Sequence, residues 1–289
     1  MEDAGAPEGG RHQGADQPPA RSGHPCLLQG RRRRLADADQ CRAGQAREGG
    51  ERGSVAQEEG VVSFSGFPPA TLQFLTGIAA HNEKAWFDDN RALYEAGYVE
   101  PAREFVETMG PLLRAISLEV QFNAKVNGSL SRINRDIRFS KDKRPYKEHL
   151  GLWFWHGGRR RWDVPGFWFE LTPKHVQLGV GLYMMQGEQL DAYRQSVIHP
   201  RSGRALLAAV AAVKDAGKYE IAGKNRKLMP RGFSTDLDRA EYLLHEGLYA
   251  HIDLPVTVAA KPGLAALCAK HYAALWPINK WLLDEVEQG

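Results

Sequence analysis

Hydrophobic residues are frequent from residue 61 onward, and in the first part of that region they recur at three- and four-residue intervals, the spacing of an amphipathic helix. Leu72, Leu75 and Ile78 form the first stripe. Asn82 suits the N-cap of a second helix, because its side chain can accept a hydrogen bond from the first turn. A third stripe runs over residues 101–117 and begins with proline, which is tolerated at a helix start. The pattern therefore predicts three helices before any strand.

The hydrophobic period then changes to about two residues, which is typical of β-strands. The predicted strands cover residues 119–126, 133–139, 147–155, 166–171 and 176–184. Residues 172–175 have the composition of a tight turn and are predicted to join the last two strands as a hairpin.

Glycines alternate in the last of these strands. Gly179 and Gly181 share one face, which leaves a floor without side chains that a ring or a ligand can approach. We expect a tryptophan ring to fill this space in preference to a ligand, with Trp153, Trp155 and Trp168 as candidates.

Helical spacing returns after residue 184. The predicted elements are helices over residues 190–198, 206–213 and 264–282 and short strands over residues 219–222 and 248–254. Pro277 is expected to end or kink the last helix. Helices followed by strands and then by helices predict an α+β fold with a mainly antiparallel central sheet, flanked by N-terminal and C-terminal helices. No linker-like composition interrupts residues 61–289, so we expect a single domain there.

The first 60 residues differ from the rest in composition. They contain no Phe, Trp, Tyr, Ile, Lys, Asn or Thr. Such a segment cannot bury enough apolar surface to offset the entropy of ordering it, so disorder is expected. Two explanations stay open, a true flexible tail and a misplaced translation start, with the natural chain beginning near Val61 or Val62. The second is the preferred interpretation.

Cysteines and targeting signals exclude several classes of protein. Cys26, Cys41 and Cys268 show no metal-ligand spacing, so neither a disulfide framework nor a metal site is expected. No nucleotide-binding glycine motif is present, so no cofactor is predicted. The chain has no secretory signal and no apolar run of the ~18 residues that a membrane helix needs. We therefore expect a soluble cytoplasmic protein without a membrane partner; the oligomeric state stays open.

Positive charge is concentrated in one stretch. From Arg132 to Lys147 the chain holds seven Lys or Arg and only two acids. Strand alternation places Arg135 among the apolar side chains of this stretch, where an unpaired guanidinium would be costly. Glu170 on a neighbouring strand or Asp136 is the expected partner, which predicts a structural role for Arg135 and Glu170.

The opposite face of the same stretch is the basis of the preferred functional hypothesis. Arginine presents a planar fork of donors that matches carboxylate or phosphate, so we expect a pocket that binds an anionic small molecule. The predicted anion-binding residues are Arg132, Arg138, Lys143, Lys147, Lys224, Lys227 and Arg231. Asp136, Asp142 and Tyr146 are the candidate catalytic residues, as bases or as an acid. Whether the protein is an enzyme stays open.

The charged stretch also resembles a known family. The pattern Arg132-x-x-Arg135-Asp136-x-Arg138-Phe139, followed by Asp142-Lys143-x-x-Tyr146, is similar to the signature of the bacterial and fungal "domain of unknown function 2461" family. The resemblance covers most of residues 61–289 and includes the segments "PGFWFEL" and "GVGLY"; the tail has no counterpart. Because the activity of that family is not established, the resemblance implies no reaction.

Two alternatives to the anion pocket stay open. Basic segments over residues 132–147, 159–161 and 224–231 lie among strand aromatics, a combination that suits single-stranded nucleic acid, although a net charge of +3 is low for that role. Alternatively, the cluster is an ion-pair network that fixes a turn, and function depends on a protein partner.

Overall fold

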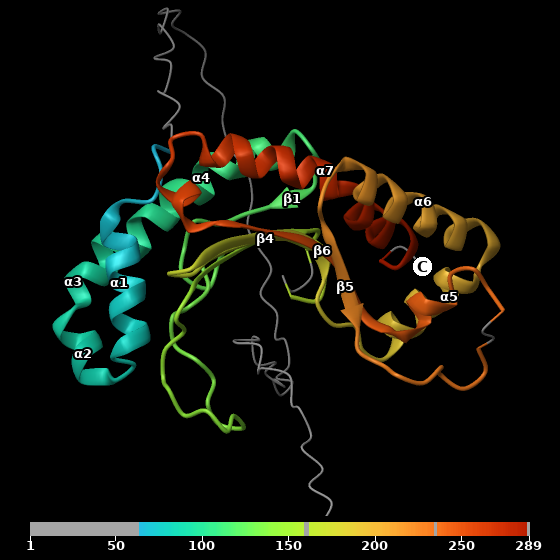
Figure 1. The fold of residues 1–289 in the computed structure, drawn as a ribbon, viewed down its shortest axis with the longest axis horizontal. Coiled ribbons are helices and arrows are strands. Elements are labelled where there is room, and N and C mark those ends of the chain that lie inside the picture. The colour runs from blue at the N-terminus through green and yellow to red at the C-terminus, as the bar shows by residue number, and fades with distance from the viewer. Residues whose placement is uncertain (1–63, 159–161, 234–235, 288–289) are drawn as a thin grey trace, which may run out of the picture.

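The structure, a computed structural model, describes residues 64–158, 162–233 and 236–287. Helices come first, a sheet follows, and helices end the described part (Figure 1), which confirms the predicted α+β class. The predictions for the tail, residues 1–60, and for the basic run of residues 159–161 lie outside the described residues.

An antiparallel sheet forms the centre of the molecule. Among the described residues it has six strands in the order β1-β2-β3-β4-β6-β5. The strands are β1 Val120–Gln121, β2 Leu150–His156, β3 Gly166–Leu171, β4 His175–Leu182, β5 Glu220–Lys224 and β6 His245–Pro255. Thr172 and His175 close the hairpin between β3 and β4 by a backbone hydrogen bond of 3.0 Å, as predicted.

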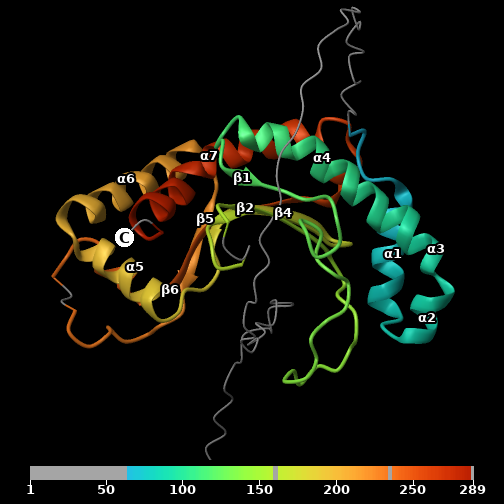
Figure 2. The same ribbon diagram turned by 180° about the vertical axis from the view of Figure 1, so that it is seen from behind.

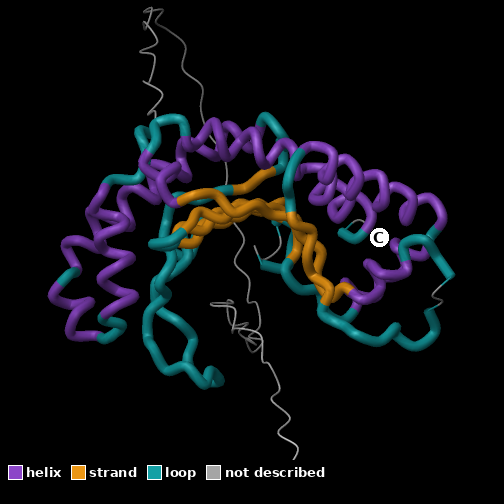
Figure 3. Tube along the Cα trace, viewed as in Figure 1, coloured by secondary structure: helices purple, strands orange, loops and turns teal. Residues whose placement is uncertain are grey.

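In the sequence, helices come both before β1 and after β4. Those before it are α1 Pro69–Ala80, α2 Lys84–Asp89, α3 Arg91–Tyr94, the π-helical turn η1 Glu95–Val99 and α4 Glu100–Arg114. Those after β4 are α5 Glu188–Ile198, α6 Pro200–Ala216, the 3₁₀ turns η2 Ala240–Leu244 and η3 Val256–Ala260, and α7 Leu264–Glu285. Figure 3 shows the helices along one face of the strand layer and beyond its two ends.

α4 and α7 pack on the same face of the sheet (Figures 1 and 2). From α7, the Tyr272 hydroxyl donates to the carbonyl of Trp168 at 2.8 Å, and Trp276 stacks on Phe167 with ring centroids 5.8 Å apart. From α4, Phe105 meets Phe169 at 4.7 Å. These apolar side chains are fully or mostly buried, so this layer is the core of the protein.

The opposite face, which we call the far face, carries the alternate residues of each strand. One cross-strand row consists of Trp153, Trp168, Gly179, His251 and Glu220, on β2, β3, β4, β6 and β5 respectively. This row therefore carries two tryptophan rings, one imidazole and one carboxyl, with a glycine between them.

A tryptophan fills the glycine floor, as predicted. A Cβ added to Gly179 would lie 2.5 Å from the Trp168 ring and 2.4 Å from the Ala250 carbonyl oxygen. The Trp168 ring in turn lies parallel to the Trp153 ring, with centroids 6.3 Å apart.

Several local predictions were wrong. Residues 133–139 form no strand, and Phe139, predicted to be apolar-facing, is 85% exposed. The strand predicted over residues 119–126 is reduced to β1. α7 continues through Pro277. Asn82 is not an N-cap, because its side chain bonds to another segment, which is described below.

Substitution of Gly179 by alanine tests the floor. We expect Gly179→Ala to reduce the free energy of unfolding by about 1–3 kcal/mol, because the new methyl group overlaps both a ring and a backbone oxygen. Chemical denaturation measures this. Gly158→Ala is the matched control, since no atom lies within 4 Å of its added Cβ. Equal stability of the two variants would contradict this packing.

Candidate functional site

The charged stretch forms an irregular hairpin that extends from the start of β2. Arg135 N–H donates to the Pro145 carbonyl at 2.8 Å, and Lys147 N–H donates to the Ile133 carbonyl at 2.8 Å. We call residues 131–149 the signature hairpin. It leaves the sheet on the side away from α4 and α7 (Figure 1).

Asn82 attaches this hairpin to the helices before it. Its amide donates to the Tyr146 carbonyl at 3.0 Å and to Glu148 Oε1 at 3.2 Å, and its oxygen accepts from Tyr146 N–H at 2.9 Å. The Tyr146 ring is buried and stacks on Phe87 with centroids 4.6 Å apart. The sequence hypothesis of Tyr146 as an acid on a ligand surface therefore has no geometric support.

The arginines of the hairpin are held by acids of the same hairpin. Arg135 Nη1 lies 2.8 Å from Asp142 Oδ2, and Arg144 Nη2 lies 2.7 Å from the same oxygen. Arg138 Nη2 lies 2.6 Å from Asp136 Oδ2. The Arg138 side chain and backbone N–H hold the pKa of Asp136 at about 2. Arg144 and Arg135 lower the pKa of Asp142.

These pairs answer the question about Arg135. Its partner is Asp142, neither Glu170 nor Asp136, because the stretch folds into a hairpin that brings residues 135 and 142 together. Two carboxylates with such low pKa values are poor proton acceptors at neutral pH, so this placement does not favour Asp136 or Asp142 as catalytic bases.

The predicted anion-binding residues divide into two groups. Arg132 is exposed, and Lys143 Nζ donates to the Ile137 carbonyl at 3.0 Å in the hairpin. Lys224 ends β5, and Lys227 and Arg231 lie in the segment between β5 and η2, at the other end of the strand order. Figures 1 and 2 show the two segments at opposite ends of the sheet, so they do not converge on one anion.

His149 and Glu170 form a polar pair at the hairpin end of the sheet. His149 Nε2 lies 3.7 Å from Glu170 Oε2, and the side chains are 20% and 30% exposed. Burial raises the pKa of Glu170 to about 7, opposed by Lys147. Burial, together with Lys147 and Arg135, lowers the pKa of His149 to about 4. At neutral pH the pair thus combines a neutral imidazole with a carboxyl that titrates.

A pocket of about 450 Å³ lies at the other end of the sheet, next to the far face. We call it the tyrosine pocket; it is lined by Tyr183, Glu220, Ile221, Ala222, Gly223, Lys224, Asn225 and Tyr249. The rings of Tyr183 and Tyr249 are 5.6 Å apart. Among the residues that the structure describes, Lys224 forms no ion pair.

Tyr249 connects this pocket to the aromatic row of the far face. Its ring meets the Trp168 ring at 5.7 Å, edge to face, and the His251 ring at 5.9 Å. His251 Nε2 lies 3.6 Å from Glu220 Oε2. His251 Nδ1 is buried and has no partner within the described residues.

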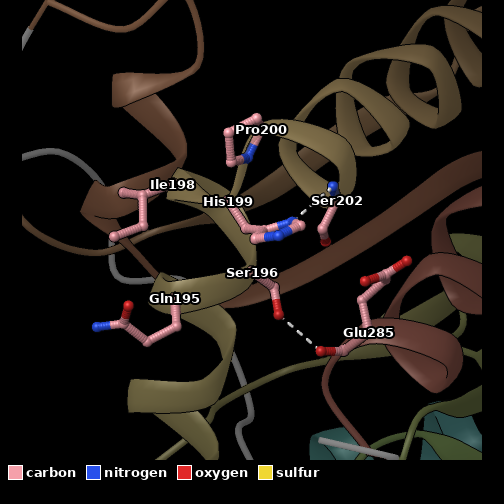
Figure 4. A pocket seen from close by; sticks show the side chains of 7 residues that line it. All are labelled: Gln195, Ser196, Ile198, His199, Pro200, Ser202 and Glu285. Carbon is pink, nitrogen blue, oxygen red and sulfur yellow. Dashed lines mark hydrogen bonds between the residues drawn. The ribbon is translucent and has the colours of Figure 1, made fainter.

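A second pocket, of about 510 Å³, lies where α5, α6 and α7 meet (Figure 4). His199 accepts from the Ser202 N–H at 3.4 Å, and the Ser196 hydroxyl donates to the Glu285 carbonyl at 2.6 Å. Figure 4 shows the Glu285 carboxylate beside this space, and Arg201 lies 4.0 Å from that group. Its lining thus supplies mainly hydrogen bonds between helix ends, and it has neither the paired rings nor the unpaired cation of the tyrosine pocket.

Metal-binding clusters and membrane-spanning helices are both absent from the part of the chain that the structure describes. No group of three or more His, Cys, Asp or Glu is placed to hold a metal ion in that part of the chain. No helix there is long and apolar enough to cross a membrane.

Sequence reasoning missed most residues of these sites. Tyr249, His251, Asn225 and His149 carried no signal for these sites in the sequence. Their cross-strand neighbours, such as Tyr249 opposite Gly181, depend on strand register. Only the alternation in β4 pointed to this face from the sequence.

Comparison with protein families gives a match over most of the chain. The model of a family described as "Conserved hypothetical protein (DUF2461)" matches residues 70–281. No curated protein matches the chain.

Substitution of Asn82 tests whether the hairpin is held by that side chain. We expect Asn82→Ala to lower the free energy of unfolding by about 1–3 kcal/mol, since it leaves the Tyr146 N–H and carbonyl without their partner. Amide exchange at Tyr146 should also become faster. Asn134→Ala, an exposed asparagine opposite Tyr146, is the control. Normal exchange in Asn82→Ala would show that other contacts hold the hairpin.

The pKa of Glu170 predicts a pH dependence. Between its ordinary pKa of 4.5 and about 7, the folded protein holds a proton that the unfolded chain has lost, so wild-type stability falls as pH rises through this range. Glu170→Gln cannot take up or release this proton, so the variant lacks this pH-dependent contribution to the free energy of unfolding. The variant should therefore gain stability relative to wild type from pH 4.5 to 7, with a constant difference above. Denaturation at several pH values measures it; a difference that does not change with pH contradicts the raised pKa.

Proposed function

The chain belongs to the DUF2461 family of conserved hypothetical proteins, and because that description assigns no activity, we propose from the geometry that the protein binds a small anionic molecule with a planar ring in the tyrosine pocket. The observation that carries the proposal is the meeting of two tyrosine rings in one pocket with Lys224, which forms no ion pair within the described part of the chain.

The size and lining of the pocket support a small molecule. Ligand pockets commonly have volumes of about 300–1,000 Å³ and combine aromatic walls with a few polar groups. The tyrosine pocket has about 450 Å³. Tyr183 and Tyr249 form an aromatic wall, on which a planar ring can pack.

The charges of the pocket support an anionic group on that ring. Lys224 forms no ion pair with any residue that the structure describes, and its ammonium can bind a carboxylate or a phosphate. The Asn225 amide can donate a second hydrogen bond to the same group. Glu220 lines the pocket as an acceptor, so a hydroxyl or N–H donor elsewhere on the ring would complete the recognition.

This proposal retains the anionic ligand expected from the sequence but changes its site. Lys224 was among the predicted anion-binding residues, whereas Arg135, Arg138 and Arg144 of the signature hairpin bind acids of their own segment. The hairpin network agrees with the structural alternative. Nucleic acid has less support, because the two described basic segments lie at opposite ends of the sheet and form no continuous track (Figure 1).

Binding can be tested with a set of aromatic carboxylates and aromatic phosphates, screened by ligand-observed NMR. At least one class is expected to bind, and Lys224→Ala should weaken it about tenfold or more, because a hydrogen-bonded charge is lost. Tyr249→Ala should remove the ring contact and also weaken binding.

The matched control is Lys227→Ala, a lysine three residues away that does not line the pocket. Its affinity should equal that of wild type. Equal losses in Lys224→Ala and Lys227→Ala would indicate a nonspecific charge effect, and the absence of binding by any ring-bearing anion would contradict the proposal.

A further inference from the structure

Two large apolar side chains are exposed at two separate places near the ends of the sheet. Phe139, in the signature hairpin, is 85% exposed, and Leu228, in the segment between β5 and η2, is 79% exposed. Exposed apolar residues that stand singly are ordinary, so Phe139 and Leu228 are informative only together with the basic residues beside them and the common direction of their segments.

Both residues lie among cations. Arg138, Lys141 and Lys143 surround Phe139 in the sequence, and the Arg138 guanidinium lies 5.7 Å from its ring. Leu228 follows Arg226 and Lys227 and precedes Arg231. Among the described residues, Lys141, Lys227 and Arg231 form no ion pair, so their charges are available to an external partner.

The two segments leave the sheet on the same side. Figures 1 and 2 show both extending away from α4 and α7, one at each end of the sheet. A broad surface placed against the far face could therefore contact both segments at once, which a small ligand could not do.

We propose that the protein docks peripherally on an anionic lipid surface through Phe139 and Leu228, with Lys141, Lys227 and Arg231 on the lipid headgroups. Apolar side chains that enter the interface and basic side chains that attract anionic lipid are the two contributions that hold peripheral proteins on membranes. Neither the apolar nor the electrostatic contribution alone gives stable attachment. Each of the two segments carries an exposed apolar residue and basic residues, so each provides both contributions.

A lipid surface fits better than a nucleic acid. Nucleic-acid platforms stack bases on aromatic rings, and Leu228 has no ring to stack. The sequence led us to expect no membrane partner because no segment can span a bilayer, but peripheral docking needs no spanning segment. The inference is independent of the tyrosine pocket, which can bind its ligand whether or not the protein docks.

Sedimentation with vesicles tests the docking. The full chain is mixed with vesicles of phosphatidylcholine alone or with about 30% phosphatidylserine. We expect binding only to the anionic vesicles, decreasing as salt is raised, because the attraction is screened. The double substitution Phe139→Ser with Leu228→Ser should reduce the partition coefficient of the protein onto the vesicles about tenfold or more. The reason is the loss of two apolar side chains that would be buried in the lipid interface.

Leu118→Ser is the matched control. Leu118 is 88% exposed, comparable to the two docking residues, but it lies in the connection between α4 and β1, on the α4 side of the sheet (Figures 1 and 2). Its partition should equal that of wild type. Because all three residues are exposed, the variants should unfold at the wild-type temperature, which a thermal scan checks.

Three results would overturn the proposal. Equal binding to neutral and anionic vesicles would exclude the role of the cations. Equal losses in Leu118→Ser and the double variant would exclude a specific surface. No binding to either vesicle, with the protein folded, would exclude lipid as the partner.

Discussion

The packing of α7 on one face of the sheet is the constraint on which the far face depends. The Tyr272 hydroxyl donates to the carbonyl of Trp168 from the core side, while the Trp168 side chain projects to the other side. A buried hydrogen bond therefore fixes the strand at the residue whose ring covers Gly179 and meets Tyr249. With α4 on the same side as α7, the opposite side is left to rings, carboxyls and the two basic segments.

The signature hairpin shows that a high density of charge need not be a ligand site. Asp136 and Asp142 each bind the backbone N–H and the guanidinium of the arginine two residues later, so acids of the hairpin itself hold Arg138 and Arg144. Local side-chain bonds of this kind compete with a regular strand ladder. This is why the alternation of residues 133–139 predicted a strand that does not form, and why the hairpin instead projects Phe139 into solvent.

What the sequence could predict depended on the range of the interaction. β3 and its hairpin to β4 follow from local periodicity and were predicted nearly to the residue, while the stripe of α1 indicated a helix without its bounds. The hydrogen bonds between Asn82 and Tyr146 join positions 64 residues apart in the chain. Asn82 therefore makes a tertiary contact instead of the N-cap that local chemistry suggests. The His149–Glu170 pair and the tyrosine pocket likewise require strand register and order, which the pattern of a single chain does not contain. The arginine at 135 needed a partner, as expected, but the folding of the hairpin determined which acid it was.

Strand order also separates the two polar sites. In the strand register, Glu170 on β3 lies opposite Gln177 on β4, which lies opposite Asp253 on β6. The pocket residue Tyr249 is also on β6, four residues before Asp253 and therefore two strands away from β3. With strands about 4.8 Å apart and a rise of about 3.3 Å per residue, Glu170 and the pocket are roughly 15 Å apart or more. A single ring in the tyrosine pocket therefore cannot reach the His149–Glu170 pair. Any proton transfer at Glu170 must therefore involve a molecule other than that ring, or a distant part of a longer one.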